Sequence, residues 1–197
     1  MTRRVPLVVI LAGPNGAGKS TTAPFLLKDA LAVDEFVNAD TIAQGLSAYR
    51  PEAAAMAAGR IMLDRLRALA RAKQDFAFET TLSGRSHARW LRGLGAAGYR
   101  RHLVFLSLPS ADLAVARVAD RVRRGGHHVR DDAVRRRFTA GIRNLFSVYM
   151  DAVDTWTVYD NADAVSPRLV AARALDGRDE VADEAAWLAL KEASHDH

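Results

Sequence analysis

The chain carries the segment Gly13-Pro14-Asn15-Gly16-Ala17-Gly18-Lys19-Ser20 close to its N-terminus. This segment matches the pattern G-x-x-x-x-G-K-[ST] at every fixed position. An apolar run typical of a strand, Val5 to Leu11, precedes it, and a helical pattern, Thr21 to Ala30, follows it. A glycine-rich turn between a strand and a helix lets backbone N–H groups surround a phosphate, and the helix N-terminus favours negative charge. The segment therefore predicts a phosphate-binding loop.

The side chains of this loop have expected roles in holding ATP. Lys19 is expected to reach the outer phosphates and the Ser20 hydroxyl to hold Mg²⁺. A chance match in an Ala-rich and Gly-rich chain is the alternative, and the flanking strand and helix argue against it. Asn161, after the last core strand, is expected either to contact adenine or to form a turn. The predicted ATP-binding residues are thus Gly13, Pro14, Asn15, Gly16, Ala17, Gly18, Lys19, Ser20, Thr21 and Asn161.

Length and composition indicate one α/β domain. The chain has 197 residues, of which 49% are hydrophobic, and it has no cysteine. Disulfides, thiolate zinc sites and thiol nucleophiles are therefore excluded, and a reducing cytoplasmic location is expected. The net charge of +5 suits anionic substrates, nucleotides or nucleic acid. The apolar run Leu7 to Ala12 is far too short to span a bilayer and no other run is longer, so we expect neither a membrane span nor an export signal.

Strand and helix patterns alternate along the chain, which predicts a parallel sheet with helices on both faces. We expect the three-layer sandwich of P-loop proteins, formed by residues 1–197 as a single domain with an Arg-rich lid at about 117–137. The expected strands are Val5–Ala12, Glu35–Asn38, Asp75–Glu79, Arg101–Leu108, Trp156–Tyr159 and Arg168–Leu175. The expected helices are Thr21–Ala30, Pro51–Ala72, Ser83–Ala97, Ala111–Arg124, Asp131–Val153 and Glu184–Ala193.

Polar residues follow the second and third predicted strands, where ligands bind in open α/β sheets. Asp40 is expected to accept the proton of an attacking hydroxyl, with Asn38 orienting it or binding substrate. The alternative for Asp40 is a helix N-cap. Glu79 is expected to bind Mg²⁺ through water or to grip the substrate, because an acid directly after an apolar strand is typical of a Walker B segment. Thr80, Thr81 and Arg85 complete the predicted substrate side, with local helix capping as the alternative for one threonine.

A basic segment is expected to close over the nucleotide. Between Arg117 and Arg137 there are eight arginines and three aspartates. The two predicted helices of this segment are separated by a hinge, Gly125-Gly126-His127-His128. Arginine suits a migrating phosphoryl group because its guanidinium is planar, permanently charged and bidentate. A solvated charged face is the alternative for most of these side chains. The predicted catalytic arginines are Arg117, Arg121 and Arg136, which act with Asp40 and Lys19.

Together these residues resemble the zeta-toxin family of P-loop kinases. The resemblance runs from the phosphate loop to Tyr159-Asp160-Asn161 and is most specific at Phe36-Val37-Asn38-Ala39-Asp40 and at Phe78-Glu79-Thr80-Thr81-Leu82-Ser83-Gly84-Arg85. It implies a kinase fold, ATP and Mg²⁺ as cofactors, and Asp40 as the general base. It also implies UDP-N-acetylglucosamine as the acceptor and an inhibitory antitoxin as the partner. The chain departs from the better-known toxins in its shorter C-terminal part, in its lid and in the segment Thr81 to Arg85.

Two other functions remain open on the sequence alone. One is a metabolic or antibiotic-modifying kinase with the same mechanism and another acceptor. The other is an ATP-binding module or ATPase acting on nucleic acid. The concentration of arginine in the lid and the lack of a basic strand with interleaved aromatic residues argue against nucleic acid as a partner. No Asn-Lys-x-Asp motif is present, which argues against a GTPase.

Overall fold

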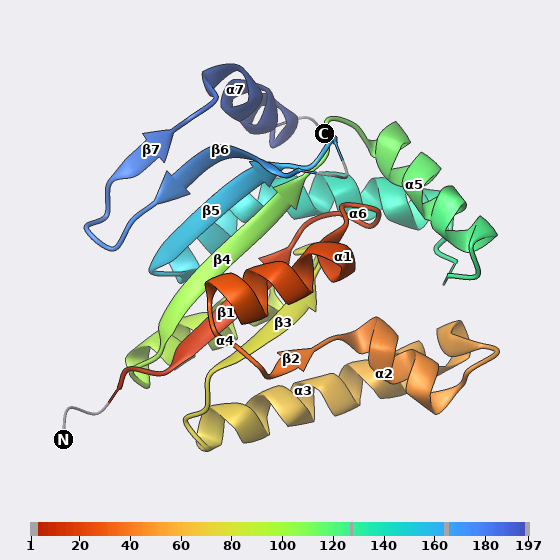
Figure 1. Ribbon diagram of the computed structural model, residues 1–197, viewed down its shortest axis with the longest axis horizontal. Coiled ribbons are helices and arrows are strands. Elements are labelled where there is room, and N and C mark those ends of the chain that lie inside the picture. The colour runs from red at the N-terminus through yellow and green to blue at the C-terminus, as the bar shows by residue number, and fades with distance from the viewer. Residues whose placement is uncertain (1–3, 127, 164–165, 196–197) are drawn as a thin grey trace.

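A seven-stranded sheet forms the centre of the protein (Figure 1). The computed structural model describes residues 4–126, 128–163 and 166–195. The strand order is β2-β3-β1-β4-β5-β6-β7, and β1 to β5 pair in parallel. The strands are β1 (Leu7–Ala12), β2 (Phe36–Val37), β3 (Phe76–Thr80), β4 (Arg100–Ser107), β5 (Thr155–Asp160), β6 (Arg168–Arg173) and β7 (Asp179–Val181).

Strand β1 explains why the phosphate loop lies where it does. All six of its residues, Leu7–Ala12, are buried, as expected for an apolar strand between two parallel neighbours. After β1 the chain builds β2 and β3 on one side and then crosses to β4 on the other. Such a reversal of strand order opens a crevice at the carboxyl end of the first strand. The loop 13–20 leaves β1 at this crevice.

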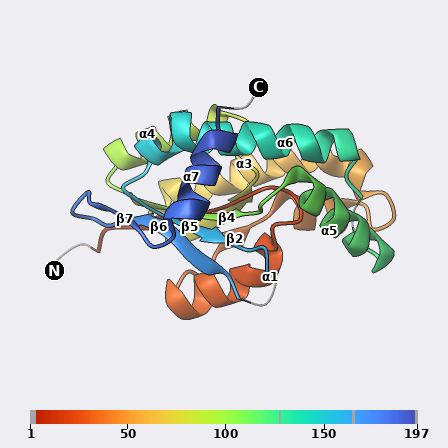
Figure 2. The same cartoon turned by 90° about the horizontal axis from the view of Figure 1, so that it is seen from above.

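Helices lie on both faces of the sheet, so the expected α/β fold is confirmed. In Figures 1 and 2, α1 lies on one face, while α4 and α6 cover the other. None of the helices in the described residues is long and apolar enough to cross a bilayer. The α-helices are α1 (Lys19–Ala23), α2 (Ala39–Leu46), α3 (Ala55–Arg71), α4 (Ser86–Ala96), α5 (Ala111–Arg123), α6 (Asp131–Asn144) and α7 (Glu184–Ala193). Short π-helical or 3₁₀ turns extend them at η1 (Pro24–Ala30), η2 (Pro51–Ala54), η3 (Leu145–Tyr149) and η4 (Met150–Ala152).

The elements differ from the expectations in four details. The sheet is not entirely parallel, because β6 and β7 form an antiparallel hairpin through the turn at Gly177, whose φ is +79°. Strand β7 was not predicted, since its three exposed residues carry no alternating pattern. The predicted helix Asp131–Val153 ends as a regular α-helix at Asn144, and the predicted helix Ser83–Ala97 begins only at Ser86.

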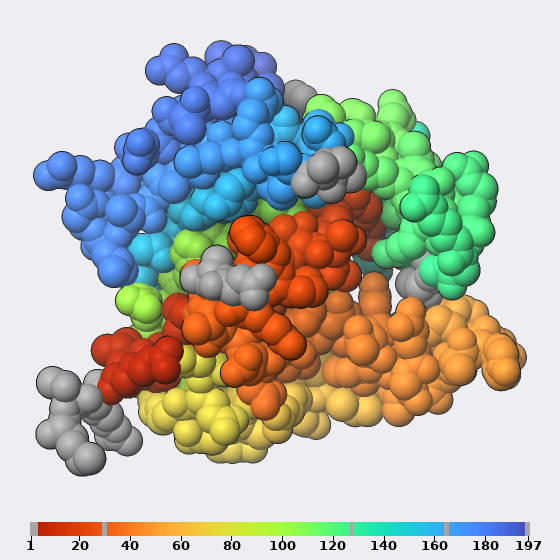
Figure 3. Space-filling view, viewed as in Figure 1, coloured from red at the N-terminus to blue at the C-terminus, as the bar shows by residue number. Residues whose placement is uncertain are grey.

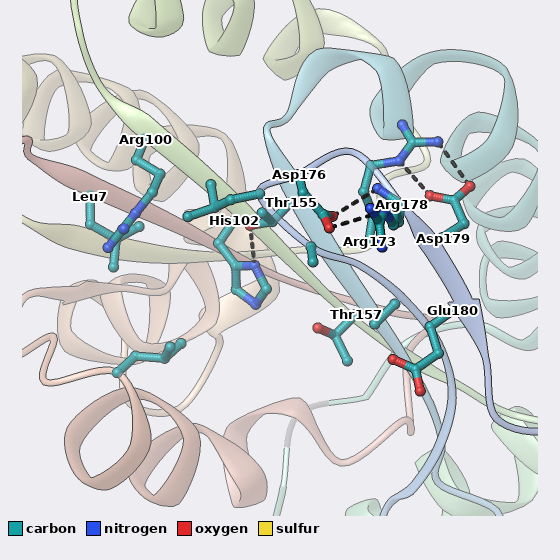
Figure 4. A pocket seen from close by; sticks show the side chains of 14 residues that line it. Leu7, Arg100, His102, Thr155, Thr157, Arg173, Asp176, Arg178, Asp179 and Glu180 are labelled. Carbon is teal, nitrogen blue, oxygen red and sulfur yellow. Dashed lines mark hydrogen bonds and ion pairs between the residues drawn. The ribbon is translucent and has the colours of Figure 1, made fainter.

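The sheet is left partly open on the face that carries α1. The surfaces of β4 and β5 are visible between α1 and the β6–β7 hairpin in Figure 3. A hollow of about 740 Å³ lies there, lined by polar residues such as His102, Thr155 and Thr157 (Figure 4). In it His102 Nδ1 and Thr155 Oγ1 are 2.7 Å apart. The hollow lies at the amino ends of β4 and β5, whereas the phosphate loop follows the carboxyl end of β1, so this hollow is remote from the predicted chemistry.

The buried imidazole of His102 makes stability depend on pH. Burial, with the positive charge of Arg100 adding to it, lowers the pKa of His102 from 6.5 to about 4. Between these values the unfolded chain binds a proton that the folded chain does not. We therefore predict that the free energy of unfolding falls as the pH is lowered from 6.5 to about 4 and that this contribution is constant below. Urea unfolding of the wild type and of His102→Asn at several pH values measures it.

The exposed His128 supplies the control, since His128→Asn should leave the pH dependence as it is in the wild type. An equal pH dependence in wild type and His102→Asn would contradict the prediction.

Candidate functional site

The phosphate loop is a tight turn that needs its glycines. Gly13, Gly16 and Gly18 have positive φ values of 143°, 80° and 79°. A Cβ atom at Gly13 would lie 2.3 Å from the Leu106 carbonyl oxygen, and one at Gly16 would lie 2.8 Å from the Ala114 carbonyl oxygen. The backbone of the loop is therefore pressed against β4 and α5, and only glycine allows both this approach and the left-handed conformation.

Lys19, the first residue of α1, is folded back into the loop. Its side chain is only 4% exposed, and its Nζ donates hydrogen bonds to the carbonyl oxygens of Gly13 and Pro14, both at 2.9 Å. The Glu79 Oε1 atom lies 3.5 Å from Nζ. Burial lowers the pKa of Lys19, the carboxylates of Glu79 and Asp40 oppose this, and the guanidinium of Arg121 adds to it. Charges from three other segments of the chain thus act on one ammonium group.

Glu79 connects the phosphate loop to the start of α2. Its Oε2 atom accepts hydrogen bonds from Ser20 Oγ at 3.0 Å and from Asn38 Nδ2 at 2.7 Å. Asn38 Oδ1 in turn accepts from the backbone N–H groups of Asp40 at 2.7 Å and Thr41 at 3.2 Å. Asn38 is therefore the N-cap of α2, and the N-cap alternative for Asp40 is wrong. Asp40 lies in the first helical turn.

A cavity of about 330 Å³ collects the predicted donor side of the site. Lys19, Ser20, Asp40, Glu79 and Arg121 all line it. Asn15, Gly16, Gly18 and Thr21 line it too. The five charged or hydroxyl side chains come from α1, α2, β3 and α5, which are far apart in sequence. A cavity lined by both basic groups and carboxylates suits a polyphosphate together with its counterion.

Ser20 and Glu79 fit the requirements of Mg²⁺. A hydroxyl and a carboxylate lie 3.0 Å apart at the edge of the phosphate loop. Mg²⁺ takes oxygen ligands and is commonly held by one or two protein groups together with substrate phosphates. Within the described residues no group of three or more His, Asp or Glu side chains could hold a metal alone. The fit therefore extends to a cation that arrives with a nucleotide.

The predicted lid arginines are in different positions. Arg117 donates to the carbonyl oxygens of Asn161 at 2.8 Å and Ala162 at 2.6 Å, so it ties α5 to the segment after β5. Arg117 and Arg121 both line the cavity. Arg136 is exposed, whereas its neighbour Arg137 contacts Asn15 Oδ1 at 3.5 Å. Sequence reasoning missed Arg137, because helical phase within a run of three arginines is set by packing.

The hinge of the lid is only partly described. The stretch 123–125 is exposed, and Gly125 has a φ of +84°. His127 lies outside the described residues. Helix α6, included in part in the predicted lid, packs on the main core through the buried side chains of Val134, Phe138 and Ile142.

Asn161 holds the phosphate loop through a buried hydrogen bond. Its side chain is buried, and its Nδ2 donates to the Ala17 carbonyl oxygen at 2.7 Å. A Cβ atom at Gly18 would lie 2.7 Å from the same nitrogen. Asn161 thus contacts the turn directly, a role that the expected adenine contact or turn position did not include.

The predicted substrate side is a loop between β3 and α4. Thr80 Oγ1 accepts from the Leu82 N–H group at 3.1 Å, and Thr81 Oγ1 lies 2.9 Å from Ser83 Oγ. The capping alternative for the threonines is wrong, because the N-cap of α4 is Arg85 and no side chain caps this helix. Arg85 Nε donates to Asn144 Oδ1 at 2.9 Å. Asn144 was not predicted.

Comparison with known proteins places this fold and site in a family. The model AAA_33, described as an AAA domain, matches residues 8–147. The chain belongs to this family. A protein of Haemophilus influenzae, named as an uncharacterized protein, is 29% identical over 130 residues, which cover 66% of this chain and 91% of that protein.

Solved structures share the fold at low identity. The AvrRxo1-ORF1:ORF2 structure with ATP matches with a TM-score of 0.71 at 16% identity. The match covers 96% of this chain but only 63% of that chain, so our chain spans less than two thirds of this neighbour. The PezAT toxin–antitoxin system of Streptococcus pneumoniae matches with a TM-score of 0.63 at 16% identity, over 98% of this chain and 80% of that chain. The fold is therefore that of P-loop kinases.

The contact between Asn161 and the loop yields a prediction. In Asn161→Asp a carboxylate oxygen replaces the Nδ2 donor and faces the Ala17 carbonyl oxygen. We expect the free energy of unfolding to fall by about 1–3 kcal/mol, because a buried acceptor loses its donor and meets a second acceptor. ATP affinity should fall as well. Urea unfolding and an ATP titration measure the two effects.

Ser107→Ala is the matched control, since it removes a hydrogen bond to the Tyr159 carbonyl oxygen on the neighbouring strand without touching the loop. Equal ATP affinity in Asn161→Asp and the wild type would show that the loop does not depend on this contact.

Proposed function

We propose that the protein is an ATP-dependent phosphotransferase that moves the γ-phosphate to a hydroxyl group of a small molecule. The observation that carries the proposal is the single cavity lined by Lys19, Ser20, Asp40, Glu79 and Arg121. The loop residues alone would suit a hydrolase or a nucleotide-dependent switch as well. The carboxylate of Asp40 in the same cavity favours a kinase, because it is best suited to accept the proton of an acceptor hydroxyl. The family match and the P-loop kinase fold support the same reaction class.

In this mechanism the phosphates of ATP occupy the loop, and Lys19 exchanges its two carbonyl partners for phosphate oxygens. Ser20 and Glu79 would hold Mg²⁺, which would supply positive charge against the phosphates. Asp40 accepts the proton of the acceptor hydroxyl as that oxygen bonds to the γ-phosphorus, while the bond from the γ-phosphorus to the β–γ bridging oxygen breaks and ADP leaves. Arg121 stabilises the negative charge on the migrating group, with Arg137 close to the loop at Asn15.

The acceptor proposed first is a UDP-N-acetyl sugar, and a protein antitoxin is the proposed partner. Both follow from the resemblance to zeta toxins, and the fold likeness to the PezAT toxin–antitoxin system supports them. A metabolic or antibiotic-modifying kinase uses the same residues on another acceptor.

The decisive experiment identifies the product. A metabolite extract is incubated with the protein and Mg²⁺-ATP, and mass spectrometry searches for compounds that gain one phosphate. We expect a phosphorylated UDP-N-acetyl sugar. In Asp40→Asn the transfer should slow by about 10²- to 10⁴-fold, because the general base is lost. Asp64→Asn, the same change at an exposed helix position, should transfer at the wild-type rate.

If another metabolite gains the phosphate, the proposed acceptor is wrong, and the proposal that the protein is a kinase still holds. Full transfer by Asp40→Asn would overturn the general base. ATP hydrolysis that nucleic acid stimulates, with no phosphorylated metabolite, would overturn the phosphotransferase itself.

Two arginines on α5 allow the effect of a cation in the cavity to be distinguished from the effect of positive charge on the surface. Arg121 lines the cavity, whereas Arg123 is exposed and pairs with Asp120. We predict that Arg121→Ala lowers the rate of transfer by about 100-fold, because a cation aimed at developing charge is lost. Arg123→Ala should change it little. Initial rates of ADP release at saturating ATP measure both, and similar rates in the two variants would contradict a catalytic Arg121.

A further inference from the structure

One face of α6 contacts both the phosphate loop and the loop after β3. Arg137, Gly141 and Asn144 recur at i, i+4 and i+7 and therefore share this face. Arg137 contacts Asn15 of the phosphate loop. Asn144 lies ~10 Å further along the helix axis, at a rise of about 1.5 Å per residue. Helix α6 is anchored in the core. The distance between its contact with the phosphate loop and its contact with the loop after β3 is therefore fixed.

Asn144 holds the segment 80–85, which we name the acceptor loop. Its side chain is buried, and its Nδ2 donates to the carbonyl oxygens of Leu82 at 2.8 Å and Ser83 at 3.2 Å. Its Oδ1 accepts from Arg85 Nε at 2.9 Å. One amide thus satisfies three groups of a single loop. A buried amide with a purely structural role needs only to have its own polar atoms paired. The amide of Asn144 in addition orders a loop at the edge of the predicted active site.

The acceptor loop has a conformation that requires such support. Leu82 has a φ of +55°, which is unfavourable for a residue with a branched side chain. Gly141 allows the helix to approach, since a Cβ atom there would lie 2.5 Å from the Thr81 carbonyl oxygen. The loop also begins directly after Glu79, whose carboxylate lines the cavity. Strain at Leu82 is therefore offset by α6 within a few residues of the proposed chemistry.

Arg85 remains able to bind a ligand while it is held. Its Nε is used by Asn144, its side chain is exposed, and no other described residue receives a hydrogen bond from it. The two Nη groups are therefore available, in a fork that matches the oxygens of a phosphate or carboxylate. Fixing a long side chain before binding reduces the conformational entropy lost on binding.

We propose that Asn144 is a positioning residue that orders the acceptor loop, so that Arg85 recognises an anionic group, a phosphate or carboxylate, of the acceptor. This inference rests on the proposed phosphotransferase function. It specifies that function, because the acceptor must carry a negative charge in addition to the hydroxyl that is phosphorylated.

The test combines kinetics with hydrogen exchange in full-length variants. UDP-N-acetylglucosamine is the acceptor probe. In Asn144→Ala we expect its KM to rise by about tenfold, the effect of losing one well-placed hydrogen-bonded contact, with kcat and the KM for ATP nearly unchanged. Backbone amides of the acceptor loop should exchange faster, and those of the phosphate loop should not. Arg85→Gln should raise the KM alike with little change in exchange, because it removes the charge but leaves the two hydrogen bonds from Asn144 Nδ2 to the backbone carbonyl oxygens of Leu82 and Ser83.

Ser147→Ala is the control, since Ser147 is exposed and donates only to the Arg143 carbonyl oxygen of its own helical segment. Asn144→Asp preserves the side-chain volume and takes the place of Asn144→Ala if the latter does not fold. Unchanged exchange in the acceptor loop, or a loss of kcat without a change in KM, would overturn the proposal. If the wild type does not phosphorylate UDP-N-acetylglucosamine, the proposed acceptor is wrong, and the exchange rates still decide the role of Asn144.

Discussion

The hydrogen bonds to the carboxylate of Glu79 connect the phosphate loop to the start of α2. This one side chain accepts from Ser20 in the phosphate loop and from Asn38 at the start of α2, and it lies within ion-pair distance of Lys19. A carboxylate at the end of a central strand has few ways to be satisfied except by such donors. The position of Asp40 follows from it, because Asn38 connects Glu79 to the first turn of the helix that carries Asp40.

Lys19, the buried cation of the site, has partners within the protein. Lys19 uses the carbonyl oxygens of Gly13 and Pro14 and the carboxylate of Glu79, which replace the phosphates that the loop is shaped to bind. A buried ammonium without such partners would be strongly unfavourable. In the proposed mechanism, ATP and its cation would exchange partners with Lys19, Ser20 and Glu79. Helix α6 gives this rearrangement a fixed frame, since it contacts the phosphate loop through Arg137 and the acceptor loop through Asn144.

Much of the fold was predictable because its signals are local. The apolar strand before Gly13, the glycines of the turn and the helical pattern after Ser20 are read from neighbouring residues. The antiparallel β7 and the end of α6 at Asn144 were not predictable, because they depend on pairing and packing between distant segments. The same limit applies to the arginines. Sequence places eight of them in one segment, but helical phase and packing decide that Arg137 contacts the phosphate loop and that Arg136 faces solvent.

The sequence by itself determined the phosphate loop and the types of side chain that surround it, because the motif Gly13–Ser20 and the acids after two strands are short-range patterns. Only the tertiary structure decided which partners these side chains have. Asn38, and not Asp40, is the N-cap of α2. Asn161 donates a hydrogen bond to the phosphate loop at Ala17. Asn144, on a helix far along the chain, donates a hydrogen bond to the Leu82 carbonyl oxygen. The physical reason is that a buried polar atom must find a hydrogen-bond partner, and which partner is within reach depends on how distant segments pack.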